Sequence, residues 1–502
     1  GASLASTASC LIEVEYNPTL VSAGDNDTIE INYNDGVAAQ TSTRDVTGIA
    51  VAPATLTISE SDPYNFGTLA TGATQMHTFT ISNTGGFQAS VVAEVGLASP
   101  FVYVGGSYPG TGGDCSNTLA PAGSCTIVIE YAPGVVSVLD SDQIQFDYND
   151  GVNPQSVTRD VQGVAVTPAS ITISETDPYD FGSLATGGST SYTFTLNNGG
   201  GFTASAILEV GLGAPYDFLG GTFPGTGGSC GATLAPSASC DVVIEFAPTV
   251  TGAQPDTIEF SYFNGASTVS ATRDVTGTGA APALLTITET DPYDFGNVTQ
   301  GATATYTFTI NNTGAVAATA VGGSGLVAPF SFLGGSYPGT GGDCGGTINA
   351  SATCDIVVEF APTAATPAAD SIEINYNDGA ASQTSLRDVT GTGITPATLT
   401  ISGTDPVDFG LIAAGGTTSQ VFTITNSGDS SATGMGESGL GAPFQFLGGG
   451  YPGTGGDCAG TLAGGGTTCT IVVEYAPPVI NADSDTIIID YNDGAAVQAA
   501  TR

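Results

Sequence analysis

Cysteine is the residue type whose spacing in this chain points most directly to chemistry. Eight of the nine cysteines fall into four pairs, and the two members of each pair are ten or eleven positions apart. The pairs are Cys115/Cys125, Cys230/Cys240, Cys344/Cys354 and Cys458/Cys469, and Cys10 is left without a partner in this segment. Zinc needs four ligands at a site, and two thiols per pair with one histidine in the chain cannot supply them. We therefore expect four local disulfides and an extracellular or cell-surface location.

Carboxylates are the second group of side chains that could bind a ligand, and calcium is the ion that would suit them. One set of aspartates clusters where a strand is expected to begin, and a second set recurs directly before a proline. The first set is Asp25, Asp27, Asp140, Asp142, Asp483 and Asp485, and the second is Asp62, Asp177, Asp291 and Asp405. The sequence contains no twelve-residue calcium loop, so solvated turns are the competing interpretation. No other cofactor is expected.

A catalytic site would require a nucleophile beside a base, a carboxylate pair in a cleft, or a metal centre. His77 is the only histidine in the chain, so no triad can be assembled in every repeat. We interpret His77 as an ordinary strand residue. The sequence therefore favours a protein that is not an enzyme.

The arginines show that the chain is a tandem repeat. There is no lysine, and the five arginines lie 114 or 115 positions apart, four of them followed by Asp-Val. They are Arg44, Arg159, Arg273, Arg387 and Arg502. The spacing predicts complete units at 53–167, 168–281 and 282–395. The second half of a unit precedes them at 1–52, and 396–502 is a unit that lacks most of its last strand.

The overall charge excludes two classes of partner. Forty-seven acidic residues against five arginines give a formal net charge of −42. Such a surface repels a nucleic-acid backbone and an anionic bilayer, so neither is expected as a partner. No apolar run is long enough to span a bilayer, and we expect no membrane insertion in this segment.

Apolar and polar residues alternate with the period of a half-buried strand. Ile29, Ile31 and Tyr33, for example, share one face, and polar residues lie between them. In the unit 53–167 this pattern predicts strands at 55–59, 76–82, 89–95, 101–104, 125–131, 143–148 and 156–161. Seven short strands in about 115 residues are typical of an immunoglobulin-like sandwich. The predicted fold class is all-β, with tandem seven-stranded immunoglobulin-like β-sandwiches in an elongated array.

An Asp-Gly or Asn-Gly dipeptide lies between the last two predicted strands of each unit. A two-residue type I′ turn at this dipeptide would fix the register of the hairpin. That register places every arginine directly across from an aspartate, which predicts five structural ion pairs. The pairs are Arg44 with Asp27, Arg159 with Asp142, Arg273 with Asp256, Arg387 with Asp370 and Arg502 with Asp485.

Four motifs recur in the same order in the units. In their order within a unit they are Asp-Pro-Tyr-Asp-Phe-Gly, as at 177–182, Thr-Phe-Thr-Ile-Asn-Asn-Thr-Gly, as at 307–314, Ser-Cys-Asp-Val-Val-Ile-Glu-Phe-Ala-Pro, as at 239–248, and Val-Thr-Gly-Thr-Gly, as at 275–279. This order resembles the Hydin-type (ASH) immunoglobulin-like domains that bacterial choice-of-anchor D proteins carry in tandem. The resemblance implies a secreted or surface-displayed array, and it lends no catalytic residues.

A glycine-rich loop with a single aromatic residue precedes each cysteine pair. The aromatic residues are Tyr108, Phe223, Tyr337 and Tyr451. They either cover the core of their own domain or contact a neighbouring chain. Short proline-containing links between the units predict a semi-rigid rod.

The ends of the sequence fall inside predicted units, and two explanations stay open. The position that aligns with the partner of Cys10 lies just before residue 1, and the last unit stops at Arg502 within its final strand. Either the sequence is a piece of a longer chain, or subunits exchange strands and self-associate into a filament. The expected function is an extracellular filament, stalk or adhesin shaft. The alternative is a binding module whose glycine-rich loops recognise carbohydrate or a host protein.

Overall fold

The computed structural model describes residues 3–502, and every regular element in this range is a β-strand. No helix in this range is long and apolar enough to cross a membrane. The chain divides into two compact units, one of Gly1–Tyr179, Ser191–Glu245 and Pro255–Val275, and one of Asp180–Thr190, Phe246–Gln254 and Thr276–Arg502. Repeats 53–167, 282–395 and 396–502 each lie within one unit, whereas 168–281 is divided between both.

Repeat 53–167 is a sandwich of two sheets. One sheet has the strand order β3-β5-β9-β7, and the other has the order β4-β11-β10-β6-β8. The strands are β3 (Leu56–Ile58), β4 (Tyr64–Ala70), β5 (Gln75–Asn83), β6 (Ala89–Glu94), β7 (Phe101–Tyr103), β8 (Thr118–Leu119), β9 (Ser124–Tyr131), β10 (Ser137–Asn149) and β11 (Pro154–Val166). All sheet neighbours with a known register are antiparallel except β4 and β11, which run parallel.

The core of this repeat lies between the two sheets because each strand turns its apolar residues inward. On β5, Phe79 and Ile81 are buried, and Thr80 between them faces outward. Ile129 of β9 and Phe146 of β10 join the same core from the two sheets. Burial of large side chains from both layers is the main source of the stability of such a sandwich.

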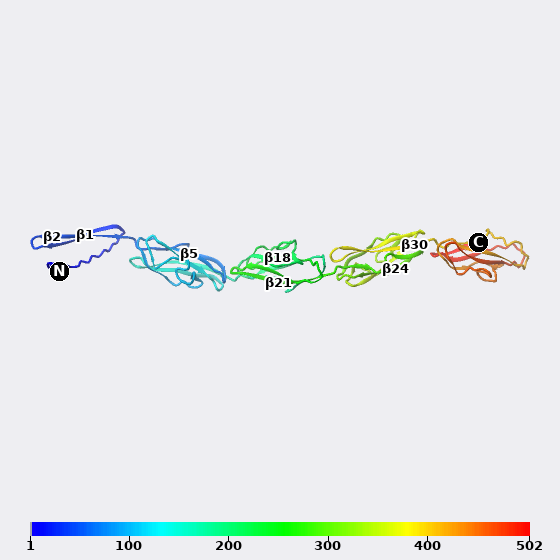
Figure 1. The fold of residues 1–502 in the computed structure, drawn as a ribbon, viewed down its shortest axis with the longest axis horizontal. Helices are drawn as coiled ribbons and strands as arrows, with labels where there is room; N and C mark the ends of the chain where they lie inside the picture. The colour runs from blue at the N-terminus through cyan, green and yellow to red at the C-terminus, as the bar shows by residue number, and fades with distance from the viewer. Residues whose placement is uncertain (1–2) are drawn as a thin grey trace. The chain divides into compact units, whose positions relative to one another are not determined.

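Repeat 282–395 has the same topology, with strand orders β22-β24-β28-β26 and β23-β30-β29-β25-β27. Figure 1 labels β24 and β30, which belong to its two different sheets. The strands are β22 (Leu285–Ile287), β23 (Tyr293–Thr299), β24 (Ala304–Asn312), β25 (Ala318–Ser324), β26 (Phe330–Phe332), β27 (Thr347–Ile348), β28 (Thr353–Phe360), β29 (Pro367–Asn377) and β30 (Ser382–Ile394).

Repeat 396–502 has sheets ordered β31-β32-β36-β34 and β35-β33-β37-β38. The strands are β31 (Leu399–Ile401), β32 (Thr418–Asn426), β33 (Ala432–Glu437), β34 (Phe444–Phe446), β35 (Thr461–Leu462), β36 (Thr467–Tyr475), β37 (Ile488–Asn492) and β38 (Val497–Thr501). Residues 407–413, which align with β4, form no strand here.

Repeat 168–281 contains the corresponding strands. They are β12 (Ile171–Ile173), β13 (Tyr179–Ala185), β14 (Thr190–Asn198), β15 (Ala204–Glu209), β16 (Tyr216–Phe218), β17 (Thr233–Leu234), β18 (Ser239–Phe246), β19 (Gly252–Ala253), β20 (Asp256–Phe263) and β21 (Thr268–Ala280). Strand β12 pairs with β14, and β20 pairs with β21, in the antiparallel sense.

The described residues before position 53 form a hairpin alone. Strands β1 (Ser22–Asn34) and β2 (Ala39–Ala50) pair with each other and with no further strand. Figure 1 shows them as a two-stranded ribbon beside the N-terminal segment of the chain, which contains no strand. Their apolar residues are largely exposed.

The predicted fold class is confirmed, since every regular element of residues 3–502 is a β-strand and the complete repeats are sandwiches of two sheets. The predicted strands of the type unit all exist, but the repeat has nine strands, and 64–70 and 118–119 were missed. Strand β4 escapes a local pattern because it pairs parallel to β11, almost 100 positions later in the chain. The predicted domain boundaries stay a prediction.

Candidate functional site

The turn between β10 and β11 is longer than predicted. Asn149 pairs with Pro154, so Asp150 to Asn153 form a four-residue loop. The Asp150 side chain caps this loop, because its Oδ1 accepts hydrogen bonds from the amides of Val152 and Asn153 at 2.7 and 2.6 Å. These backbone bonds hold the pKa of Asp150 below its ordinary value.

The longer turn shifts the register by two positions, so the five predicted ion pairs are wrong. Arg159 lies across from Ile144 and not from Asp142. The other four arginines also lie across from a residue two positions beyond the predicted aspartate. Arg44 faces Ile29, Arg273 faces Ile258, Arg387 faces Ile372 and Arg502 exchanges backbone hydrogen bonds with Ile487, instead of Asp27, Asp256, Asp370 and Asp485. A shift of two keeps every side chain on its predicted face.

The arginines of the complete repeats bind the end of the first strand and the segment that follows it. Arg159 donates from Nη2 to the Ile58 carbonyl at 2.6 Å, and its Nη1 lies 3.7 Å from Asp62 Oδ2. Equivalent contacts are made by Arg273 with Ile173 and Asp177, and by Arg387 with Ile287 and Asp291. Arg502 donates to the Gly403 carbonyl. Arg159, Arg273 and Arg387 thus each fasten one sheet to the other within their own repeat.

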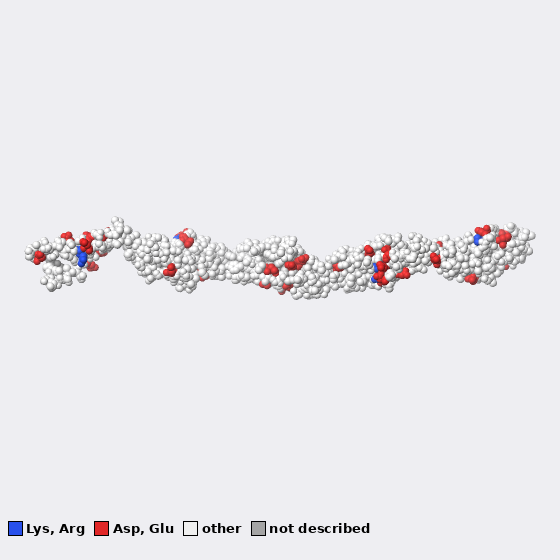
Figure 2. Space-filling model, turned by 45° about the horizontal axis from the view of Figure 1, so that its top comes forward, with Lys and Arg blue, Asp and Glu red and all other residues white. Residues whose placement is uncertain are grey.

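Three of the proline-preceding aspartates, a predicted set of calcium ligands, are therefore partners of arginine. Asp62 also accepts a hydrogen bond from the amide of Asp160 at 3.0 Å. About half of the Asp62 side chain is exposed, so the ion pair itself contributes only about 0–1 kcal/mol. On the face that Figure 2 shows, the blue arginine side chains have acidic side chains in red beside them.

The aspartates once expected to face arginine bind backbone amides instead. Asp142 Oδ2 accepts from the amide of Ala98 at 2.6 Å, and its Oδ1 accepts from Gln143 at 2.8 Å. The same bonds to the loop before the short aromatic strand recur in the later repeats. They join Asp256 to Gly213, Asp370 to Val327 and Asp485 to Gly441. In the hairpin β1–β2, Asp27 accepts from the amide of Thr28.

The remaining members of the predicted calcium clusters bind a tyrosine. Tyr131 donates to Asp140 at 2.7 Å, Tyr475 donates to Asp483 at 3.0 Å, and Tyr16 donates to Asp25 at 2.6 Å. Burial first, and then the hydrogen bond to Asp140, raise the pKa of Tyr131.

The repeats that lack this aspartate also lack the tyrosine. Phe246 and Phe360 stand at the tyrosine position, and Gln254 and Ala368 stand at the aspartate position. The aspartate therefore occurs in the repeats that have a tyrosine hydroxyl to donate to it. The clustered carboxylates act as acceptors for protein donors, which explains their recurrence without an ion.

Among residues 3–502, one group of three metal-competent side chains lies close together. It consists of Asp343, Cys344 and Cys354. The two cysteines are bonded to each other in a disulfide, so their sulfurs are not thiolate ligands.

Four disulfides fasten the glycine-rich loops to the sandwich. They join Cys115 to Cys125, Cys230 to Cys240, Cys344 to Cys354 and Cys458 to Cys469. The loop runs directly over β9, where a Cβ on Gly110 would lie 2.3 Å from the Val128 carbonyl oxygen. Only glycine allows this approach. Cys10 is free and exposed.

The aromatic residue of each glycine-rich loop covers the core of its own repeat. The ring of Tyr108 lies 5.6 Å from the ring of Tyr103 and 5.6 Å from that of Phe146. Phe223 contacts Phe218 and Phe260, Tyr337 contacts Phe332, and Tyr451 contacts Phe446 in the same way. Burial raises the pKa of Tyr337 to about 12. These rings thus pack as lids over their own domains.

His77 is a packed strand residue. Its ring stacks on Tyr64 with centroids 4.2 Å apart, and its Nε2 lies 3.5 Å from Glu60 Oε1. The aligned position is Tyr192 or Tyr306 in two later repeats, and these rings also lie against the tyrosine that corresponds to Tyr64. The histidine therefore replaces an aromatic residue in a stack.

Sequence reasoning missed a buried asparagine at the end of the second long strand. Asn83 is 1% exposed, and its Nδ2 donates to the carbonyls of Phe87, Leu119 and Ala120. Its Oδ1 accepts from the amides of Thr55 and Gly85. Asn198, Asn312 and Asn426 repeat this arrangement. The sequence could have indicated this residue, because Asn83 continues the inward-facing positions of Phe79 and Ile81 although it is polar.

Comparison with known families places the best-defined repeat. Residues 286–391 match the HYDIN/CFA65/VesB-like, Ig-like domain model. Comparison with curated proteins found none that matches the chain.

Solved structures that are similar to this chain have low identity to it. An I-band fragment of titin is 12% identical and covers 69% of this chain and 99% of its own, with a TM-score of 0.24. The protocadherin GammaB4 extracellular domain is 11% identical and covers 95% and 71%, with a TM-score of 0.25. The ASH/PapD-like domain 7 of human CEP192 is 15% identical and covers 23% and 87%, with a TM-score of 0.18.

Proposed function

We propose that the chain is an extracellular structural array, the spacer of a filament, stalk or adhesin, and not an enzyme. One observation supports this most strongly. The polar residues that recur in every complete repeat bind groups of their own repeat, as Arg159 binds Ile58 and Asp142 binds Ala98. Residues used in this way hold a fold together and are not available to transform a substrate.

Two further features support an extracellular location. Four disulfides form within short loops, and such bonds persist in oxidising compartments. The sequence carries a large excess of acid, which keeps a repetitive β-protein soluble outside the cell. We propose display on a bacterial surface, in line with the resemblance to choice-of-anchor D proteins.

Self-association is the proposed partnership. The loop aromatics contact their own cores, so we propose that copies meet through sheet edges or repeat ends rather than through these rings. Electron microscopy of the native material tests this. Continuous fibres with a period that is a multiple of the repeat would support self-association, and dispersed particles at all concentrations would contradict it.

The spacer role has its own experiment. Deletion of 168–281 from the full-length protein on its native surface removes one repeat with its own disulfide. A spacer loses reach in proportion to the deleted repeat and keeps its attachment at both ends. Complete loss of the surface function, with the shortened protein still folded and displayed, would contradict the spacer.

A binding module is the second candidate, and one patch favours it. Val135, Val136, Val138 and Leu139 in repeat 53–167 are 76%, 57%, 92% and 55% exposed. Repeat 282–395 has only Ala, Thr and Pro in the aligned segment 364–369. If the patch binds a partner, Val136→Ser with Val138→Ser abolishes attachment. A spacer is unaffected by the same change.

A further inference from the structure

Neighbouring repeats meet where the hairpin turn of one repeat touches the end of a strand in the repeat before it. At two junctions this contact is apolar. A Cβ on Gly265 would lie 2.8 Å from the Ala70 methyl group, and one on Gly379 would lie 2.8 Å from the Ala185 methyl group. Ala70 and Ala185 are 0% and 1% exposed. The side chain next to each turn is also apolar, Phe202 at the first junction and Val316 at the second.

The junction between 282–395 and 396–502 is polar at both of these positions. Thr299 takes the place of the alanine, and it faces the Gly494 turn. Ser430 takes the place of Phe202 and Val316, four positions after the buried asparagine. The two hydroxyl oxygens lie 2.5 Å apart and form a hydrogen bond. Thr299 is 8% exposed and Ser430 is 5% exposed, so this bond is buried.

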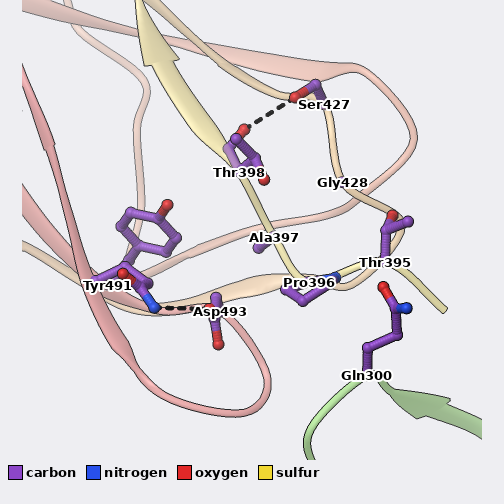
Figure 3. A pocket seen from close by; sticks show the side chains of 10 residues that line it. Gln300, Thr395, Pro396, Ala397, Thr398, Ser427, Gly428, Tyr491 and Asp493 are labelled. Atoms are coloured by element: carbon purple, nitrogen blue, oxygen red, sulfur yellow. Dashed lines mark hydrogen bonds between the residues drawn. The ribbon is translucent and has the colours of Figure 1, made fainter. Parts of the chain in front are cut away.

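The link between the two repeats holds Ser430 in position. The Thr395 hydroxyl donates to Asp429 Oδ2 at 2.7 Å and accepts from the amide of Asp429 at 2.9 Å. The amide of Ser430 donates to the Thr395 carbonyl at 3.0 Å. In Figure 3, Gln300 of the preceding repeat points toward Thr395 and Pro396 across a pocket of about 510 Å³. The polar pair is therefore part of a polar junction.

The two hydroxyls depend on each other. A buried hydroxyl that loses its only partner is unsatisfied, whereas replacement of both partners by apolar groups removes the need for the bond. We propose that Thr299 and Ser430 are a matched recognition pair, which makes the surface of 282–395 specific for the 396–502 repeat. A repeat with an apolar residue at the Ser430 position leaves Thr299 unpaired, and Ser430 against an alanine is unpaired in turn. The pair thus specifies the order of repeats, which the spacer role does not require.

A double-mutant cycle in the full 502-residue chain tests the pairing. Thr299→Ala, Ser430→Val and the double variant are compared by amide hydrogen exchange at Ser430 and Ala495. Each single variant leaves one hydroxyl unpaired, and we expect exchange at these amides to accelerate roughly five- to a hundredfold. The double variant has the residue types of the junction at Ala185 and Val316, and we expect its exchange to return to within a few fold of the parent rate. Exchange at Ala380, in the neighbouring junction, is the control and stays unchanged.

The opposite substitutions, made in the junction between 168–281 and 282–395, test the same idea at a second site. Ala185→Thr alone accelerates exchange at Ala380, and the addition of Val316→Ser restores it. If the two changes in either junction have additive effects, or if the single variants have none, the side chains do not recognise each other and the proposal is wrong.

Discussion

Two hairpins in this chain share a sequence pattern and differ in what covers them. Strands β1 and β2 pair in the same register as β10 and β11, and Asp35 and Asp150 cap the same four-residue turn. In repeat 53–167 the inward-facing Phe146 is 0% exposed and Tyr148 is 8% exposed. The aligned residues Ile31 and Tyr33 of the first hairpin are 43% and 51% exposed.

The difference separates local from non-local causes of structure. Pairing and turn geometry depend on residues within the hairpin, and they are the same in both places. Burial depends on a facing sheet, which β5 and β9 supply in repeat 53–167. We therefore expect the two hairpins to respond differently to changes in the core, and alike to changes in the turn.

The largest expected difference comes from the core. Phe146→Ala removes a fully buried ring and leaves a cavity, which lowers the free energy of unfolding of repeat 53–167 by about 3–5 kcal/mol. Ile31→Ala changes a half-exposed side chain and costs below about 1 kcal/mol. Urea unfolding followed by amide exchange within each segment measures both. Equal losses of unfolding free energy in the two variants would mean that the β1–β2 hairpin is also covered by a facing sheet.

The disulfide gives the next largest difference. Cys115→Ala with Cys125→Ala opens a loop closed over a separation of 10, which costs about 2–3 kcal/mol in the chain-entropy account. Cys10→Ala changes a free, exposed thiol and leaves stability unchanged. Thermal unfolding of the two variants makes the comparison, with the parent chain under reducing conditions as the control.

The arginines are expected to differ by less. Arg159→Ala removes a half-buried hydrogen bond to Ile58 and the ion pair with Asp62, at a cost of about 1–2 kcal/mol. Arg44 is exposed on its hairpin, and Arg44→Ala costs below about 0.5 kcal/mol. Urea unfolding of each variant checks this. A larger loss at Arg44 than at Arg159 would contradict the assignment of Arg159 to the contact between sheets.

The smallest effect is expected from acid, which should act on the turns of both hairpins in the same way. The pKa of Asp150 is lowered by backbone bonds from Asn153 and Val152, and that of Asp35 by bonds from Ala38 and Val37. A lowered pKa stabilises the folded state above the ordinary value of 3.8, and this stability is lost as the pH falls through the folded value. Both turns should therefore open below about pH 4.

Repeat 168–281 is a natural control for this effect. Its turn is capped by Asn264, whose side chain accepts from Ala266 and Ser267 and carries no charge. Amide exchange between pH 5 and pH 2 should show no turn opening there, and Asp150→Asn should behave in the same way. Acid sensitivity that persists in Asp150→Asn would exclude this carboxylate as the cause.

Local patterns predicted much of the fold. Alternation predicted the long strands, and the cysteine spacing predicted bonds that the structure forms. The predicted register of the hairpin was wrong because Asp-Gly suits both a two-residue and a four-residue turn. The Asp150 carboxylate stabilises the longer turn by accepting hydrogen bonds from two backbone amides. The partner of Arg159 could not be found locally, because Asp62 lies almost 100 positions earlier.

The polar residues of the repeat were harder to predict than its strands. Asn83 stands at a position where alternation calls for an apolar residue, and its five backbone partners come from several loops. The hydrogen bond from Tyr131 to Asp140 joins two different strands or their ends, so the pattern of a single strand does not predict it. Side-chain partners across sheets depend on topology, which a single strand pattern does not contain.

Force-extension measurement on single molecules of the 502-residue chain tests most directly whether the complete repeats are separate closed sandwiches in series. We expect discrete unfolding steps, one per complete repeat, each lengthening the molecule by roughly 300–340 Å, which is about 3.3–3.6 Å per residue outside the disulfide loop less about 40 Å for the folded sandwich. Under reducing conditions each step should lengthen by roughly 30–40 Å, because the loop closed by Cys115 and Cys125, and its equivalents, then extends too. Release of the whole chain in one event, or steps that reduction leaves unchanged, would contradict the account.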